Sequence, residues 1–260
     1  MKRSRTALVT GSSSGIGLAT AKVLAASGVQ VMLHGLEEQA IGEPIAQALQ
    51  QEFGVQTRYF CADLATPDAV KQLVNATVTQ LGALDILVNN AGIQYTAATQ
   101  DFPVHKWDQV LAVNLSAAFH ATRLALPAME QAGWGRIINI ASVHGLVGSA
   151  NKAAYCAAKH GLVGLTKVVA LEQAANGVTA NAICPGWTDT PILNHQIQVF
   201  AEEHGVSIDE AKLGLLHSKT PYPSLIDPAS IGAMIVFLCS DAAAAITGAA
   251  LPIDGAWTAQ

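Results

Sequence analysis

Short apolar runs alternate with longer amphipathic segments along the whole chain of 260 residues. The apolar runs are rich in Val, Ile and Leu, as in strands of a parallel sheet that is covered on both faces. They occupy residues 6–10, 30–34, 55–61, 85–88, 136–141, 178–183 and 250–253. The helical patterns occupy residues 18–27, 37–53, 107–129, 192–218 and 231–240, with two more beginning near Pro67 and around Tyr155. This alternation predicts an α/β fold, a Rossmann-type doubly wound parallel sheet of about seven strands with helices on both faces.

The chain shows no linker, internal repeat or low-complexity tract. We therefore expect a single dinucleotide-binding and catalytic domain over residues 1–260. The helical pattern in the segment at about 190–218 is longer than the sheet requires. A helical insertion over the strand ends is typical of a mobile substrate lid, and we expect one here.

The composition argues against a nucleic-acid-binding protein and against a membrane-spanning one. Hydrophobic residues make up 51% of the chain and charged residues 13%, and the net charge is −5, which gives no basic field for nucleic acid. No apolar stretch approaches the length of a membrane span. The cysteines are scattered, without metal-ligand spacing, so we expect reduced thiols, a cytoplasmic location and no metal site. They are Cys61, Cys156, Cys184 and Cys239.

A glycine-rich turn stands between the first predicted strand and the first predicted helix. Gly11, Gly15 and Gly17 are spaced as G-x-x-x-G-x-G. Glycines let the backbone approach a pyrophosphate, and the new helix offers unpaired N–H groups and the positive end of its dipole. The turn is therefore a candidate dinucleotide site, although such a motif is a weak signal by itself.

Tyr155 and Lys159 are four residues apart in a helical pattern, which places both side chains on one face. Moving a tyrosine pKa from about 10 to about 7 needs roughly 4 kcal/mol of preferential stabilisation of the phenolate. An ammonium about 4 Å away supplies that order of energy at an effective dielectric near 20. The pair is therefore a candidate general acid and base. The alternative is one aromatic core residue and one solvated lysine.

These motifs, taken together, resemble the short-chain dehydrogenase/reductase family over nearly the whole chain. The same glycine spacing, the Asn89-Asn90-Ala91-Gly92 segment after the fourth strand and a serine directly after the fifth strand are found in that family. The resemblance implies hydride transfer between a nicotinamide cofactor and a carbonyl or alcohol. It also implies a catalytic set in the family's order and spacing, namely Asn114, Ser142, Tyr155 and Lys159.

The resemblance implies a role for each of the four. Tyr155 exchanges the hydroxyl proton, Lys159 lowers the phenol pKa and holds the nicotinamide ribose, and Ser142 polarises the substrate oxygen. Asn114 orders a relay water, and the competing interpretation is a purely structural buried amide. In a doubly wound sheet, ligands lie beyond the carboxyl ends of the strands, where Ser142 falls.

The second predicted strand ends at Gly35-Leu36 instead of at the acidic residue that usually holds the adenine ribose of NAD. Because neither this position nor the glycine-rich turn supplies a basic group for the extra phosphate of NADP, the sequence favours NAD. Asp63 is expected to contact adenine, or to be the N-cap of the helix near Pro67. The full set of expected cofactor-binding residues is Gly11, Ser13, Ser14, Gly15, Ile16, Gly17, Leu36, Asp63, Leu64, Asn90, Ala91, Gly92, Tyr155, Lys159, Pro185, Gly186, Trp187, Thr188 and Thr190.

Several polar side chains that hydride transfer itself does not need are expected near the same cleft. A cation among hydrogen-bond donors suits a small anionic substrate, with Lys152 binding its carboxylate. Solvated loop residues are the alternative for each of them. The expected substrate-binding residues are Gln94, Ser142, His144, Lys152, Tyr155, Trp187, Gln196 and Trp257.

This set and the residues around it are similar to those of one subfamily, the bacterial D-3-hydroxybutyrate dehydrogenases. The resemblance implies NAD-dependent, reversible oxidation of D-3-hydroxybutyrate to acetoacetate in a homotetramer. Trp257 is expected to close the pocket of its own subunit or of a neighbouring one. Two rivals stay open: a related enzyme acting on a neutral alcohol or a 3-oxoacyl substrate, and a catalytically silent NAD-binding regulator.

Overall fold

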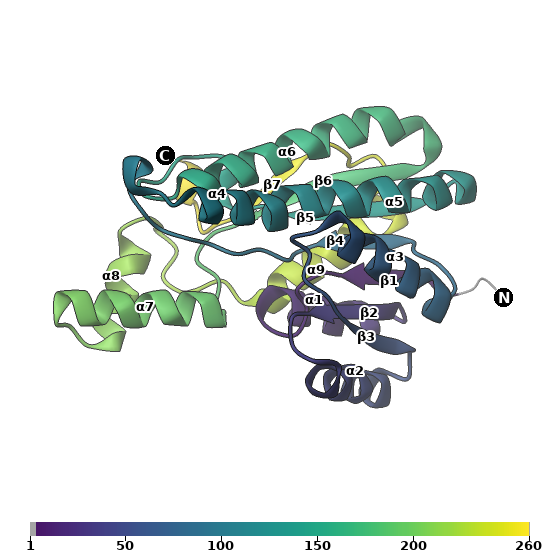
Figure 1. The fold of residues 1–260 in the computed structure, drawn as a ribbon, viewed down its shortest axis with the longest axis horizontal. Helices are drawn as coiled ribbons and strands as arrows, with labels where there is room; N and C mark the ends of the chain where they lie inside the picture. Colours follow the sequence, from purple (N-terminus) through teal and green to yellow (C-terminus); the bar gives the residue numbers. More distant parts are fainter. Residues whose placement is uncertain (1–3, 260) are drawn as a thin grey trace.

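Seven parallel strands form one sheet within the described part of the chain, residues 4–259 without the side chain of His195, in a computed structural model (Figure 1). The strand order is β3-β2-β1-β4-β5-β6-β7, so the order reverses between β1 and β4. The strands are β1 (Thr6–Val9), β2 (Gln30–Gly35), β3 (Thr57–Cys61), β4 (Ile86–Asn89), β5 (Gly135–Ile140), β6 (Val178–Pro185) and β7 (Ala250–Ile253). The predicted Rossmann-type sheet is confirmed, with each strand within two residues of its expected position.

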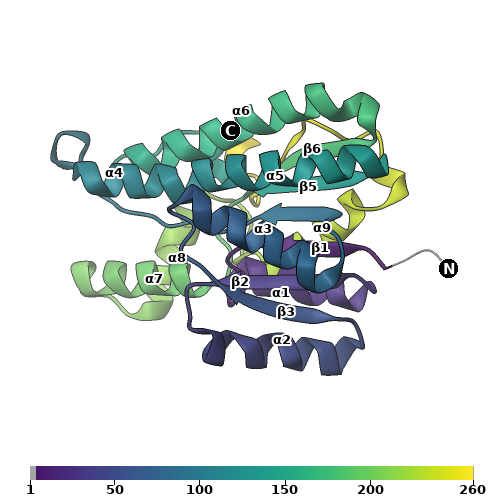
Figure 2. The ribbon, with the colours of Figure 1, turned by 45° about the vertical axis from the view of Figure 1, so that its right-hand side comes forward.

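Two layers of helices cover the sheet (Figures 1 and 2). Apolar side chains fill the space between the sheet and each layer. The helices α1, α2 and α9 pack on one face, and α3, α5 and α6 pack on the other. The central strands β1, β4, β5 and β6 are buried along their whole length, which explains their continuous apolar sequences. The helices are α1 (Gly15–Ala26), α2 (Gln39–Phe53), α3 (Pro67–Leu81), α4 (Val104–Leu111), α5 (Ala117–Ala132), α6 (Ala153–Gln173), α7 (Pro191–His204), α8 (Ile208–His217) and α9 (Pro228–Leu238).

The long helix predicted over residues 107–129 contains a defect. α4 and α5 are joined by a π-helical turn, Ala112–Ser116, which carries Asn114. Such turns widen a helix by one residue and occur frequently at functional sites. Apolar periodicity cannot reveal the turn because the backbone stays helical on both sides of it.

The helical segment predicted over residues 192–218 consists of two helices, α7 and α8. Gly205 ends α7 in the left-handed conformation, with φ of 64°. Ser207 then begins α8 with a capping box, in which its side chain accepts a hydrogen bond from the Glu210 backbone and the Glu210 carboxylate accepts one from the Ser207 backbone. A glycine that ends one helix and a serine that begins the next are the usual signals for a break between two helices.

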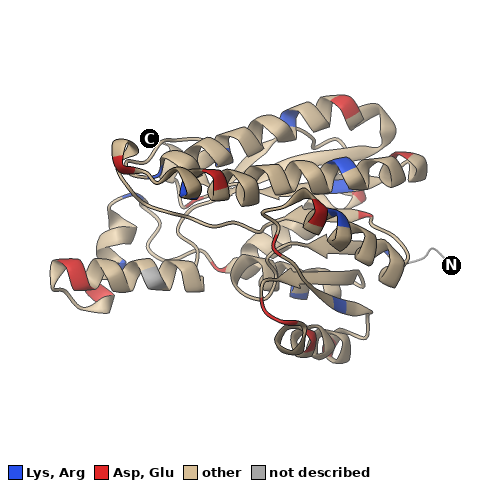
Figure 3. Cartoon of the chain, in the orientation of Figure 1, with Lys and Arg blue, Asp and Glu red and all other residues tan. Residues whose placement is uncertain are grey.

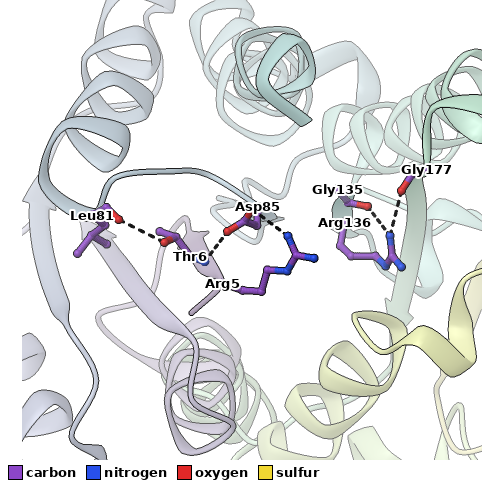
Figure 4. Close-up of polar contacts among 7 residues, drawn as sticks. All are labelled: Arg5, Thr6, Leu81, Asp85, Gly135, Arg136 and Gly177. Carbon is purple, nitrogen blue, oxygen red and sulfur yellow. Dashed lines mark hydrogen bonds and ion pairs between the residues drawn. The ribbon is translucent and has the colours of Figure 1, made fainter. Parts of the chain in front are cut away.

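Polar contacts tie the chain together at the amino ends of the strands, opposite the end where ligands bind in such folds (Figure 4). The carboxylate of Asp85 accepts hydrogen bonds from the Thr6 backbone at 2.8 Å and from Arg5 at 3.4 Å. The buried Arg136 donates to the carbonyl oxygens of Gly135 and Gly177. These contacts connect the starts of β1, β4, β5 and β6.

Charged residues are sparse along the chain, and a group of acidic residues lies where α7 ends and α8 begins (Figure 3). Its members are Glu202, Glu203, Asp209 and Glu210. Within residues 4–259, none of the helices combines the length and the hydropathy needed to cross a bilayer.

Candidate active site

A cavity of about 480 Å³ opens at the carboxyl ends of the strands. The segments that follow β1, β4, β5 and β6 form its walls, and α7 contributes a further wall. This position, beside the reversal of strand order, is where open α/β sheets bind ligands. The volume lies in the range of ligand pockets.

The glycine-rich turn is held against the end of β4 by the amide of Asn90. This amide donates to the carbonyl oxygens of Thr10 at 2.9 Å and Gly11 at 2.8 Å. A Cβ atom at Gly17 would lie 2.1 Å from the Gly11 carbonyl oxygen, so only glycine permits this approach of α1 to the turn. Gly17 therefore shapes the turn from behind and does not line the cavity.

The N-terminus of α1 faces the cavity and can bind an anion there. Ser14 is the N-cap residue, but its side chain makes no capping hydrogen bond, and the first turn carries no acidic residue. The first N–H groups of a helix need partners, and a pyrophosphate satisfies them while meeting the positive end of the helix dipole. The turn therefore fits a nicotinamide dinucleotide.

A carboxylate that the sequence did not reveal lies at the end of β2. Leu36, the position expected to carry the specificity for NAD, is 68% exposed. The next residue, Glu37, lines the cavity, accepts a hydrogen bond from Ser13 at 2.9 Å and receives another from Tyr59 at 3.2 Å. Hydrogen bonds to the carboxylate, first of all from its own backbone, lower the pKa of Glu37. An acidic residue after the second strand is therefore present, one position later than expected.

Asp63 lines the same end of the cavity, as expected for an adenine contact. Its carboxylate accepts a hydrogen bond from the Ala65 backbone at 3.0 Å. The alternative role as N-cap of the following helix is wrong, because Thr66 is the N-cap and accepts from the Ala69 backbone at 3.3 Å.

Ser142 and Tyr155 meet inside the cavity. The Ser142 side chain beside the phenol favours its ionised form, but desolvation by burial is the larger effect and raises the pKa of Tyr155. Lys159, expected to lower this pKa, is not among its main influences, and its ammonium lies 5.6 Å from the centre of the phenol ring.

Lys159 is buried behind the phenol, where its ammonium donates to the Ile140 carbonyl oxygen at 2.7 Å. Burial lowers the pKa of Lys159 to about 8, with the Cys184 thiol opposing the shift. A lysine that titrates near neutral pH can exchange protons as well as carry charge.

Asn114 lies behind the cavity wall, in the π-helical turn, and does not line the main cavity. Its amide oxygen accepts from the Ile93 backbone at 2.8 Å and its amide nitrogen donates to the Ile93 carbonyl at 2.9 Å. Both ends of the side chain therefore bind the Ile93 backbone and fix the segment that follows β4.

The opposite end of the cavity combines one cation with aromatic rings. Lys152 is half-buried, and its ammonium lies 5.9 Å from the Trp187 ring centre. Burial lowers the pKa of Lys152, and no acidic side chain of the described residues forms an ion pair with it. Burial, and then the charge of Lys152, lower the pKa of His144 to about 4, so its ring is neutral at physiological pH.

Trp257 lines the cavity of its own chain, 5.2 Å from Trp187 and 5.5 Å from His144 between ring centres. The Asp254 carboxylate fixes this turn by accepting hydrogen bonds from the Ala256 backbone and from the backbone and hydroxyl of Thr258. Two buried donor or acceptor atoms, Nδ1 of His144 and Nε1 of Trp187, have no hydrogen-bond partner among the described residues.

Most residues that the sequence singled out line this one cavity; Gly17 and Asn114 support it from behind. The lining positions that the sequence analysis missed include His34 and Glu37, whose side chains belong to the end of β2. The expected positions that line the cavity are Gly11, Ser13, Ser14, Gly15, Ile16, Leu36, Asp63, Leu64, Asn90, Ala91, Gly92, Gln94, Ser142, His144, Lys152, Tyr155, Lys159, Pro185, Gly186, Trp187, Thr188, Thr190, Gln196 and Trp257.

Comparison with known proteins agrees with this geometry. The chain is 50% identical to a D-beta-hydroxybutyrate dehydrogenase of Cupriavidus necator, over 100% of both chains. It is 42% identical to a D-beta-hydroxybutyrate dehydrogenase of Rhizobium meliloti, over 98% of this chain and 99% of that one. An actinorhodin polyketide ketoreductase crystallised with NADPH superposes with a TM-score of 0.91 at 36% identity, covering 98% and 97% of the two chains. The family model described as short chain dehydrogenase matches residues 5–198. The chain therefore belongs to the short-chain dehydrogenase family of oxidoreductases.

Proposed function

We propose that the protein catalyses the reversible oxidation of D-3-hydroxybutyrate to acetoacetate with NAD. The observation that carries the proposal is the position of Lys152, an ammonium without an acidic partner among the described residues, in the same cavity as Ser142 and Tyr155. A small hydroxy acid supplies both the carboxylate and the hydroxyl that these two ends would bind. The two relatives named as D-beta-hydroxybutyrate dehydrogenases support the same substrate.

The proposed chemistry assigns proton transfer to Tyr155. In the oxidation direction the phenolate takes the proton of the substrate hydroxyl while Ser142 donates a hydrogen bond to the same oxygen. Lys159, buried behind the phenol, would favour the phenolate against the opposing effect of burial, and it can receive or release protons because burial lowers its own pKa to about 8. When bound, the nicotinamide cofactor would supply the acceptor for the hydride that leaves the substrate carbon.

The carboxylate of the substrate would lie against Lys152, with Gln94 and Gln196 as further hydrogen-bond donors and neutral His144 beside them. All four line the cavity. Trp187 and Trp257 would exclude water and strengthen the ion pair, since charge pairs gain in a low-dielectric site. The four-carbon chain of the substrate would then extend from the Lys152 ammonium to the Tyr155 phenol.

Glu37 favours NAD over NADP as the cofactor. Its carboxylate can accept hydrogen bonds from ribose hydroxyls, whereas it would repel the additional phosphate of NADP. The basic lysines that line the cavity, Lys152 and Lys159, belong to its substrate end and its centre. The ketoreductase that superposes on the chain was crystallised with NADPH, so the cofactor choice depends on this chain's own residues.

The segment with α7 and α8 is proposed to be the substrate lid. Its two ends are joined by backbone hydrogen bonds, from Ile226 to the Trp187 carbonyl at 2.8 Å and from Asp189 to the Ile226 carbonyl at 3.0 Å. Trp187 packs with the apolar side chains of both lid helices, so lid position and the wall of the substrate end are coupled.

A homotetramer is proposed as the working assembly, with an exposed apolar stripe on α6 at an interface. Val168 is 50% exposed and Leu171 is 84% exposed, and Ala157 and Gly164 lie exposed on the same helix. Ala154 and Ala158, which were also expected to allow close helix packing, are buried within their own subunit. The neighbouring α5 adds Phe119, which is 45% exposed.

The test is formation of NADH by purified protein with each enantiomer of 3-hydroxybutyrate, for the wild type and Tyr155→Phe. Turnover of the D-enantiomer alone, nearly abolished in the variant, is the expected result. Oxidation or reduction of neutral substrates without turnover of either hydroxy acid would favour the rival enzyme of this family. Absence of turnover with any substrate, despite NAD binding, would favour the silent regulator.

A further inference from the structure

The buried imidazole of His34 joins two loops that are far apart in the sequence. Its Nδ1 accepts a hydrogen bond from the Gly11 backbone at 3.0 Å, and its Nε2 lies 3.0 Å from the Ala62 carbonyl oxygen. A carbonyl oxygen only accepts, so Nε2 carries the hydrogen, and Nδ1 must be unprotonated to accept from an N–H. The contacts therefore define a neutral ring in a single tautomer.

The backbone of His34 strengthens the same connection. Its carbonyl accepts from the Ser12 backbone at 2.7 Å, and its N–H donates to the Ser12 hydroxyl at 3.0 Å. That hydroxyl donates to the Val9 carbonyl at 2.7 Å. His34 thus connects the first half of the glycine-rich turn to β2 through both its side chain and its backbone.

Both loops that His34 joins belong to the dinucleotide end of the cavity. Gly11 lines the cavity directly, and Ala62 precedes Asp63 and Leu64, which line it as well. We propose that His34 is a positioning residue for the dinucleotide, which holds the glycine-rich turn and the end of β3 in their binding geometry only while its ring is neutral. The inference rests on the dinucleotide site of the proposed function.

A second proton on the ring would break this arrangement. Nδ1 would become a donor facing the Gly11 N–H, so the hydrogen bond would be lost and two donors would oppose each other. The charged groups near the ring are Glu37 at the end of β2 and Asp63 after β3, while the turn from Gly11 to Gly17 contributes no titratable side chain. Burial lowers the pKa of His34 in spite of both carboxylates.

Dinucleotide affinity is therefore expected to fall as the pH drops through the His34 pKa, which burial holds below the ordinary histidine value of about 6.5. The sign follows from linkage: the dinucleotide binds the neutral form, so protonation competes with binding. His144 does not produce the same effect above pH 5, because its pKa is held near 4.

The direct experiment is calorimetric titration with NAD from pH 8 to pH 5, in the absence of substrate, for the wild type and His34→Asn. The asparagine oxygen can replace Nδ1 as the acceptor for Gly11 but cannot gain a proton. His105→Asn makes the same change at an exposed histidine outside the cavity and is the matched control. The wild type and control should lose about tenfold more affinity on acidification than His34→Asn, the effect of one lost buried hydrogen bond. Parallel pH profiles for all three proteins would overturn the inference.

A second measurement needs only the wild-type protein and so does not depend on the variant folding. Nuclear magnetic resonance of the ring nitrogens should show the Nε2–H tautomer at pH 7, and saturating NAD should lower the His34 pKa by about one unit for a tenfold coupling. A His34 pKa that NAD leaves unchanged would contradict the inference while the proposed function stands. A wild type that binds no NAD at any pH would overturn both.

Discussion

At the scale of single residues, Glu37 contributes a carboxylate to the end of the cavity that is proposed to bind the adenosine. Removing it in Glu37→Gln should weaken NAD binding and strengthen NADP binding, because an acceptor for ribose is impaired and a repulsion is relieved. We expect the ratio of kcat/KM for NAD to that for NADP to fall by about 10- to 100-fold, which corresponds to roughly 1.4 to 2.8 kcal/mol. Steady-state kinetics with both cofactors measure it.

Glu38→Gln is the matched control for this change, since Glu38 is the next residue and does not line the cavity. Its cofactor ratio should equal that of the wild type. An unchanged ratio in Glu37→Gln would show that the carboxylate does not select the cofactor.

The sequence predicts the place of some residues in the cleft and misses others. Tyr155, Lys159 and Ser142 follow from spacing and from their place after a strand, since helical periodicity and strand ends fix their direction. Glu37 and His34 do not follow, because the chain leaves the regular strand at Gly35, and only the turn geometry decides which side chain enters the cavity. The distance from Lys159 to the phenol could not be predicted either, because it depends on the ammonium reaching the Ile140 carbonyl.

At the scale of secondary-structure elements, the π-helical turn places Asn114 where both ends of its amide bind the Ile93 backbone. Asn114→Leu keeps the size of the side chain but leaves the partly buried N–H and carbonyl of Ile93 without this partner. We expect a loss on the order of 3 kcal/mol in the free energy of unfolding. Urea titration at a fixed protein concentration measures this loss.

Asn176→Leu is the control for the same substitution at an exposed position, and it should change stability by less than about 0.5 kcal/mol. Equal stability of Asn114→Leu and the wild type would show that the amide is dispensable for the fold, and would favour its role in holding a relay water.

The sequence predicts where elements lie better than where they break. The strands can be predicted from their continuous apolar runs, which are present because helices cover both faces of the sheet. The π-helical turn and the split between α7 and α8 depend on one or two residues each. At Gly205 and Ser207 the stop and start signals are present in the sequence, but the amphipathic pattern continues across them.

At the scale of the whole molecule, the exposed apolar stripe on α6 predicts self-association. Burying a leucine side chain contributes about 2 kcal/mol, and in a symmetric pair each substitution acts twice. Leu171→Glu combined with Val168→Glu should therefore dissociate the proposed tetramer into smaller species at micromolar concentration. Sedimentation equilibrium measures the mass.

Ile41→Glu is the control on the opposite helical layer, where Ile41 is 59% exposed on α2. This variant should keep the wild-type mass. A wild type that sediments as a monomer at all concentrations would refute the proposed assembly without affecting the site, since Trp257 already lines the cavity of its own chain.

The central claim is that Lys152 selects a substrate by its carboxylate. Its most direct test compares kcat/KM for D-3-hydroxybutyrate and for its neutral amide, in the wild type and in Lys152→Gln. Losing a desolvated charge pair should cost about 2 to 5 kcal/mol, so the preference for the acid over the amide should fall by about 30-fold or more in the variant. An equal loss for the acid and the amide, or no loss for either, would contradict the claim and place the carboxylate elsewhere.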